Sequence, residues 1–219
     1  IVQKNPGERL TFFSGYDCDS LALENITGFA AHILPIFKKH HSSMLEFRTK
    51  SIQTSPLDSM FPIENCVIAF SLLPEAMSDA LDFKAPSIFR RLAAMKKLAD
   101  QGWKIGLRFD PLIHGKDWQS HYKDLFEKVF HLIPESAIHS VSYGPLRFPK
   151  AMYKSIVKMY PEERLFSTSL PEKSGMVAYK KEIEDEMADF CHGMFAKFVS
   201  KAIVFKCSPE VQATKRTHL

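Results

Sequence analysis

Four residues with different reactive groups lie at or just after the ends of short segments that are predicted to be strands. Cys18 supplies a thiol, Lys50 a cation, Ser71 a hydroxyl and Asp110 a carboxylate. A cation beside hydroxyl and carboxylate groups suits a charged, hydrogen-bonding ligand, and a neutral thiol is suited to donate hydrogen. Chemistry in α/β folds lies at the carboxyl ends of strands, so we expect these side chains to share one site.

Each candidate also has a structural interpretation. Asp19 or Ser20 would cap the following helix through its backbone N–H groups. A single cysteine such as Cys18 is more often a small buried residue than a reactive thiol. Arg48 and Lys50 point to the same side of one strand, as an anion clamp or as a solvated strand end.

Ser71 and Asp110 carry similar alternatives. Ser71 follows five apolar residues, where a local hydrogen bond would account for it. Asp110 precedes Pro111, which favours an extended or turn conformation. His114 follows four residues later in a polar loop, and we expect it to be exposed to solvent.

The elements that would position these residues alternate along the chain. Apolar runs predict six strands, at 10–15, 44–50, 66–72, 104–111, 140–143 and 202–207. Residues with helical spacing predict helices at 21–39, from Pro86 to Gly102, and at 118–133, 150–160 and 180–198. We expect residues 166–178 to be rich in loops.

This alternation predicts an α/β fold with mostly parallel strands and outer helices. Six strands are too few for a closed barrel of eight units, which takes about 250 residues. The chain therefore forms a partial (β/α) barrel or an open doubly wound sheet. We expect residues 1–207 to form this domain, residues 208–219 to form a flexible tail, and an uncovered sheet edge to promote association.

Composition limits the class of protein. The 219 residues are 45% hydrophobic and carry a net charge of +4, which is compatible with an anionic ligand without requiring one. No apolar run reaches the length of about 20 residues that crosses a bilayer. The first residues lack a Met and a signal peptide, which suggests a start within a longer sequence. Four scattered cysteines without a CxxC predict reduced thiols and a cytoplasmic location.

Familiar ligand motifs are missing from the sequence. There is no G-x-G-x-x-G after a strand, no P-loop and no H-E-x-x-H. His40 and His41 are explained by the end of a helix, and Asp189 with His192 is only one i, i+3 pair. The sequence therefore predicts no metal ligands.

Five segments together resemble the spore photoproduct lyase-like radical-SAM family. They are Phe12-Phe13-Ser14-Gly15-Tyr16-Asp17-Cys18-Asp19-Ser20-Leu21, Phe47-Arg48-Thr49-Lys50, Ile68-Ala69-Phe70-Ser71, 102–113 (GWKIGLRFDPLI) and 160–165 (YPEERL). The motifs are short, and their order and spacing carry the resemblance over nearly the whole chain.

The resemblance implies a partial barrel that uses S-adenosylmethionine (SAM) and a [4Fe–4S] cluster. In the family, a 5′-deoxyadenosyl radical made from SAM removes a hydrogen from a thymine dimer in DNA, and a cysteine returns one. The resemblance assigns Lys50, Ser71 and Asp110 to cofactor binding. It makes Cys18 and Tyr16 the catalytic candidates, and DNA the expected partner.

The chain departs from the family pattern at three places. The CxxxCxxC loop that holds the cluster is absent, and in the family it precedes the point where this chain begins. An alignment on Asp19 and Thr27 puts Tyr16 at the hydrogen-donor position and Cys18 two residues later, on the same side of an extended chain. The hairpin that touches lesion DNA is reduced to about residues 174–179.

Three hypotheses for function follow. The first is a radical-SAM enzyme of the spore photoproduct lyase type, acting on DNA or another substrate. The second is a nucleic-acid-binding module without catalysis. The third is a metal-free α/β enzyme that uses Asp110 and His114.

Overall fold

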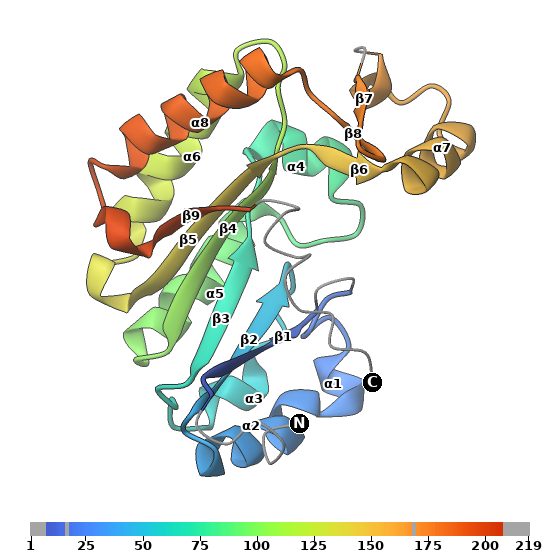
Figure 1. Cartoon of the computed structure of the whole chain (residues 1–219). Helices are drawn as coiled ribbons and strands as arrows, with labels where there is room; N and C mark the ends of the chain where they lie inside the picture. The colour runs from blue at the N-terminus through green and yellow to red at the C-terminus, as the bar shows by residue number, and fades with distance from the viewer. Residues whose placement is uncertain (1–7, 16–17, 168–169, 208–219) are drawn as a thin grey trace.

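The structure is a computed structural model that describes residues 8–15, 18–167 and 170–207. Six parallel strands form a curled sheet in the order β1-β2-β3-β4-β5-β9 (Figure 1). The strands are β1 Leu10–Ser14, β2 Ser43–Thr49, β3 Cys66–Ser71, β4 Lys104–Leu112, β5 Ile138–Pro145 and β9 Val204–Lys206. Both the six predicted strands and their parallel direction are confirmed.

Helices cover the convex face of this sheet. Those that share its hydrophobic core are α2 Phe29–Lys39, α5 Ile88–Asp100, α6 Trp118–Leu132 and α8 Lys181–Phe195. Alternate strand residues supply the other half of that core; Phe47, for example, packs edge-on against Phe29 of α2 at 5.9 Å between ring centroids. A sheet covered on one face and curled is a partial barrel, so this prediction is confirmed over the doubly wound alternative.

The side chains between these core residues face the concave side of the sheet. On β2 they are Met44, Glu46 and Arg48, because successive side chains of a strand point to opposite faces. The same alternation brings Ser71 of β3 and Asp110 of β4 to the concave side. Polar residues of the strands are therefore collected inside the half-barrel.

The predicted helix at 21–39 is wrong in one respect, because it is two helices. α1 Glu24–Thr27 ends at Gly28, whose φ of 58° lies in the left-handed region that glycine adopts at low cost. The buried carboxylate of Glu24 then accepts hydrogen bonds from the backbone N–H of Ala30 at 3.0 and 3.1 Å, near the start of α2. The glycine and this side-chain cap outweigh the continuous apolar pattern.

A small lobe stands beside the sheet (Figure 1). It contains a second, antiparallel sheet in the order β6-β8-β7 and the helix α7 Lys150–Met159. Its strands are β6 Arg147–Pro149, β7 Glu172–Lys173 and β8 Met176–Ala178. The region predicted to be rich in loops at 166–178 thus contains a short hairpin, which overlaps the reduced hairpin expected at about 174–179. It turns at Ser174 and Gly175 with φ values of 52° and 77°. We call residues 147–180 the lobe.

Two further helices were not predicted, α3 Ser55–Asp58 and α4 Glu75–Leu81, because each is too short to show a helical period. The predicted tail at 208–219 lies outside the described residues. Among the described residues, none of the helices has both the length and the apolar character needed to cross a membrane.

Candidate functional site

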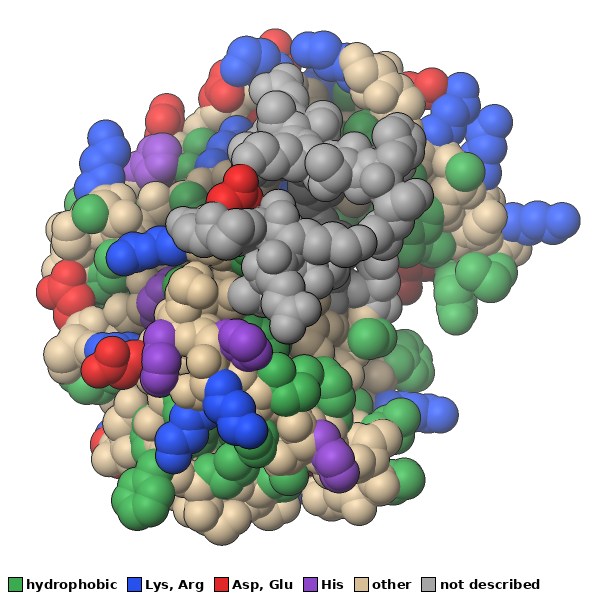
Figure 2. Space-filling view, turned by 60° about the horizontal axis from the view of Figure 1, so that its bottom comes forward, with side chains coloured by type: hydrophobic (Ala, Val, Ile, Leu, Met, Phe, Trp, Pro, Cys, Tyr) green, Lys and Arg blue, Asp and Glu red, His purple; other side chains and the backbone are tan. Residues whose placement is uncertain are grey.

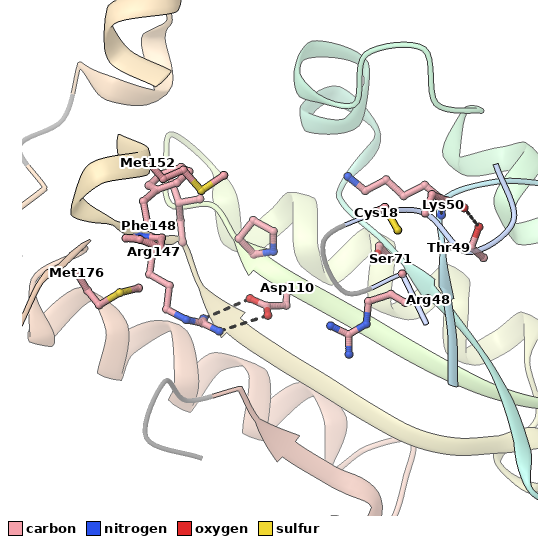
Figure 3. A pocket seen from close by; sticks show the side chains of 15 residues that line it. Cys18, Arg48, Thr49, Lys50, Ser71, Asp110, Arg147, Phe148, Met152 and Met176 are labelled. Carbon is pink, nitrogen blue, oxygen red and sulfur yellow. Dashed lines mark hydrogen bonds and ion pairs between the residues drawn. The ribbon is translucent and has the colours of Figure 1, made fainter. Parts of the chain in front are cut away.

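A cavity of about 710 Å³ lies where the strands β1 to β4 end. Cys18, Lys50, Ser71 and Asp110 all line it, and Figure 3 shows their side chains around one opening. They meet because parallel neighbours end at the same edge of a sheet. The predicted convergence of these four residues is confirmed, whereas their roles stay predictions. Tyr16, the other catalytic candidate, lies outside the described residues.

Asp19 stabilises the backbone around this opening. Its Oδ1 accepts hydrogen bonds from the backbone N–H groups of Leu21 and Ala22, both at 2.9 Å, and from the hydroxyl of Thr49 at 2.7 Å. Its Oδ2 accepts one from the backbone N–H of Lys50 at 2.6 Å. The predicted helix cap is wrong, because α1 begins only at Glu24 and has no side-chain cap. The carboxylate of Asp19 instead holds the loop after β1 against the end of β2.

Cys18, the residue before Asp19, is exposed and lines the cavity. The alternative that it is a small buried residue is therefore wrong. Because Asp19 fixes the adjacent backbone, the Cys18 thiol is carried by an anchored segment at the opening. An accessible thiol beside a ligand cavity can meet a bound substrate.

Lys50 and Arg48 both line the cavity, and each has a carboxylate partner. The ammonium of Lys50 pairs with Asp82 at 2.5 Å, and the guanidinium of Arg48 pairs with Glu46 at 2.9 Å. The Lys50 side chain is 41% exposed, so its remaining donors can reach a ligand. A solvated strand end does not describe this arrangement, because both cations are held by acidic side chains.

Asp82 is a buried acid, with a side chain only 3% exposed. Burial by itself would raise its pKa, but hydrogen bonds and charges from Lys50 and Arg91 hold the pKa of Asp82 below its usual value. Arg91, fully buried on α5, pairs with Asp82 at 2.8 Å. Neither residue was expected at the site from the sequence, because both lie on helical segments away from the strand ends.

Glu46 and Arg108 form a second buried ion pair, inside the half-barrel. Oε2 of Glu46 lies 2.6 Å from Nη2 of Arg108, and the two side chains are 8% and 2% exposed. Arg108 also donates to the hydroxyl of Ser140 at 2.9 Å. Burial would raise the pKa of Glu46, but Arg108 and then Arg48 hold it below its usual value. This charged layer underlies the cavity and orients Arg48 toward it.

Asp110 faces a cation from the lobe. Its carboxylate pairs with the guanidinium of Arg147 at 3.4 Å, and both side chains are about one-fifth exposed. The Asp110–Pro111 peptide bond is cis, and β4 continues to Leu112. This pair joins the half-barrel to the lobe across the floor of the opening (Figure 3).

The lobe supplies an apolar wall that sequence analysis did not find. Phe148, Met152 and Met176 line the cavity opposite Lys50 and Ser71 (Figure 3). No sequence pattern indicated these three residues, because they lie on a three-residue strand, an exposed helix and a hairpin. The cavity is therefore charged on one side and apolar on the other, as is common in sites for mixed polar and aromatic ligands.

His114 does not belong to this site, and the expectation that it is exposed is wrong. It is half-buried, with its ring near those of Trp118 and Tyr179 at 5.8 and 6.0 Å between centroids. His114 is absent from the residues that line the cavity, whereas Asp110 is among them. The structure thus gives no support to an enzyme that pairs Asp110 with His114.

The cysteines do not form a metal site. All four are free, and the described residues contain no group of three or more His, Cys, Asp or Glu that could hold a metal ion. Cys66 and Cys191 are buried in the hydrophobic core. Burial, and then the charge of Asp110, raise the pKa of Cys207, which follows β9. These residues do not fit a [4Fe–4S] cluster, which takes several thiolates at one point.

The curled parallel sheet, with a polar ligand cavity at its carboxyl edge, defines a partial barrel of the radical-SAM type. A sequence model described as spore photoproduct lyase matches residues 1–202. The chain belongs to the spore photoproduct lyase family, and the resemblance found in its sequence is confirmed.

Individual relatives agree with this assignment. Spore photoproduct lyase of Bacillus subtilis (strain 168) is 30% identical over 78 residues, which are 35% of this chain and 23% of that protein. A cysteine-to-alanine mutant of spore photoproduct lyase, solved with dinucleoside spore photoproduct, superposes with a TM-score of 0.82 at 19% identity. That match covers 94% of this chain and 63% of the other.

A double mutant of spore photoproduct lyase with bound AdoMet and dinucleoside spore photoproduct gives a TM-score of 0.80, also at 19% identity. It covers 94% of this chain and 62% of the other. These likenesses show the fold. The chain spans somewhat less than two thirds of the solved lyases that it matches.

Proposed function

We propose that this chain forms the ligand-binding half-barrel of a radical-SAM enzyme of the spore photoproduct lyase type, which acts on a lesion in DNA. The observation that carries the proposal is the single cavity lined by Cys18, Lys50, Ser71 and Asp110, at the carboxyl ends of four parallel strands. Membership of the spore photoproduct lyase family supports the reaction class.

The charged side of the cavity fits SAM. The Lys50 ammonium would bind the carboxylate of SAM, and the Ser71 hydroxyl and Asp110 carboxylate would bind its ribose hydroxyls or its ammonium group. When bound beside a reduced iron–sulfur cluster, SAM supplies the carbon radical that abstracts hydrogen. The described residues contain no set of thiolates that could hold that cluster.

The thiol of Cys18 is the hydrogen donor in this proposal, and its exposure at the cavity supports that role. It is exposed at the opening and carried by the segment that Asp19 anchors. A neutral thiol donates a hydrogen atom through a weak S–H bond. After the lesion is split, the S–H bond of Cys18 would break, a C–H bond would form on the substrate radical, and a thiyl radical would remain on Cys18. The alignment gives Tyr16 the same role, and the two assignments are separate parts of this proposal.

Two features of the lobe support a DNA lesion as the substrate. The apolar wall of Phe148, Met152 and Met176 suits the faces of nucleobases. Residues 147–180 hold seven of the 29 Lys and Arg residues but three of the 25 Asp and Glu residues. The surplus of four equals the net charge of the whole chain, so the rest of the sequence is neutral. Concentrated positive charge favours a polyanion.

Equilibrium binding tests the proposal directly. The chain should bind SAM, measured by calorimetry under reducing conditions, and Lys50→Met and Ser71→Ala should each weaken binding about tenfold or more. Lys96→Met is the matched control, because Lys96 pairs with Asp100 on the exposed face of α5. Unchanged affinity in the two cavity variants, or no binding by the unmodified chain, would contradict the proposal.

A nucleic-acid-binding module without catalysis is the second candidate, and the basic lobe favours it. The two functions differ in one measurement. A module would bind DNA without binding SAM, whereas the enzyme part binds both. A cytoplasmic location belongs to either proposal, and the four free cysteines support it.

A further inference from the structure

Lys50 and Ser71 end neighbouring strands, yet one buried unit holds both of them. Asp82, directly after α4, pairs with the ammonium of Lys50 at 2.5 Å. Arg91 of α5 pairs with the same carboxylate at 2.8 Å and donates to the backbone carbonyl of Ser71 at 3.2 Å. Two residues from the convex side therefore join the ends of two neighbouring strands on the charged side of the cavity.

This unit is fixed from several directions. The Nε of Arg91 donates to the carbonyl of Pro86 at 2.8 Å, and its Nη2 donates to the hydroxyl of Ser78 at 3.3 Å. That hydroxyl donates to Oδ2 of Asp82 at 3.1 Å. Arg91 is fully buried and Asp82 nearly so, which means that water does not compete for these bonds.

The arrangement leaves Lys50 suited to a carboxylate ligand. An ammonium group has three donors, and the pair with Asp82 occupies one. Lysine has a long flexible stem that loses rotamer freedom when it binds. A buried acid that already holds the ammonium over the cavity removes much of that cost, because Lys50 is oriented before the ligand arrives.

We infer that Asp82 is a positioning residue for the carboxylate-binding function of Lys50, with Arg91 as the group that fixes Asp82. This inference rests on the proposal that the cavity binds SAM. Asp82 lies beneath the ligand-facing side chains and does not line the cavity. Its effect must therefore appear through Lys50, and only for a ligand that has a carboxylate.

Two nucleosides separate this role from a structural one. S-adenosylhomocysteine carries an amino-acid group with a carboxylate and an ammonium, and 5′-methylthioadenosine has the same nucleoside without that group. Calorimetry measures the dissociation constant of each nucleoside for the unmodified chain and for each variant. The ratio of the two dissociation constants gives the preference for S-adenosylhomocysteine. Asp82→Asn should reduce the preference for S-adenosylhomocysteine about tenfold and leave the affinity for 5′-methylthioadenosine nearly unchanged. Asp58→Asn is the matched control, because Asp58 pairs with Lys97 and does not line the cavity.

Two further variants control for misfolding and test whether Asp82 acts through Lys50. Asp82→Glu keeps the negative charge beside Arg91, so it should fold, but it displaces the carboxylate by one methylene and should also reduce the ratio. Lys50→Met should abolish the preference, and adding Asp82→Asn to it should change the ratio no further. Thermal unfolding of each variant confirms that it is folded.

The outcomes are distinct. An equal loss of affinity for both nucleosides in Asp82→Asn would make Asp82 merely structural, and tighter binding of S-adenosylhomocysteine would make it a competitor for Lys50. Either result overturns the inference. Absence of any nucleoside binding by the unmodified chain would overturn the proposed function as well, whereas normal binding with an unchanged ratio in both Asp82 variants would overturn the inference alone.

Discussion

Glu46 and Arg108 lie across the concave face of the half-barrel with their charged groups 2.6 Å apart, almost entirely out of contact with water. The acid comes from β2 and the base from β4, so the pair spans β3 between them. A buried pair of this kind is not a large source of net stability, but each member depends strongly on the other. The pair therefore makes folding sensitive to pH.

The stability of the chain should fall in acid because of Glu46. Its pKa in the folded chain is below the ordinary value of 4.5, so its contribution is present above pH 4.5 and is lost as the pH falls through the folded value. Urea unfolding at pH 7, 5, 4 and 3 measures this loss. Glu46→Gln should cost about 3 kcal/mol at pH 7, because it leaves the Arg108 charge unpaired, and should flatten the acid dependence. A variant as stable as the parent would refute this account.

The cysteines should react in a definite order with iodoacetamide. Cys18 is exposed and should be modified first at pH 7. Cys207 should follow slowly, because its raised pKa leaves little thiolate, and its rate should rise steeply toward pH 9. Cys66 and Cys191 should stay unmodified until the chain unfolds, since burial raises the pKa of both thiols. Mass spectrometry of samples taken at successive times measures the modification of each cysteine. Early modification of Cys207 would contradict the structure.

DNA binding should depend on lysines of the lobe. Lys154 and Lys158 are exposed and lie one turn apart on α7, and Figure 2 shows basic side chains projecting from the right-hand edge, where α7 lies in Figure 1. Changing both to Gln should weaken binding of single-stranded DNA and lower the salt slope by about 1.4, because each neutralised phosphate contributes about 0.7 to that slope. Fluorescence anisotropy at several salt concentrations measures both quantities. Lys38→Gln with Lys39→Gln on α2 is the control and should leave the slope unchanged.

The edge of the sheet at β1 should promote self-association. Among the described residues, β1 ends the strand order, and Phe13 on it is 54% exposed. An edge strand offers unpaired backbone groups to a second chain, and an exposed aromatic adds apolar area. Light scattering should show dimers or larger species at high concentration, and Phe13→Lys should reduce them. A stable monomer in the parent chain would show that this edge is protected.

The sequence predicted the part of the site that depends on strand ends. Cys18, Lys50, Ser71 and Asp110 each follow an apolar run, and the parallel direction of β1 to β4 was enough to bring them together. Periodicity of that kind is a local property, so it can be read without coordinates. The same reasoning found six strands and an α/β fold, whereas the choice of a partial barrel over an open sheet came from the family resemblance.

Residues outside the strand ends could not be found in this way. Asp82 and Arg91 look like ordinary charged residues of helical segments, and only the packing of α4 and α5 against the sheet brings them to Lys50 and Ser71. Gly28 divides a helix that its apolar pattern presents as continuous, because one left-handed residue outweighs a long periodicity. His114 was expected in water because of its polar neighbours, yet Trp118 and Tyr179 cover it.

The positive charge of this molecule is distributed unevenly between the half-barrel and the lobe. The sequence outside the lobe is neutral and the lobe carries the whole surplus of positive charge, so the net positive charge is concentrated in the lobe. In the field of a polyanion such a body turns before it makes contact, so the lobe arrives first. The opening that the lobe borders would then face the polymer already, and salt would slow this encounter more than it would loosen the complex formed afterwards.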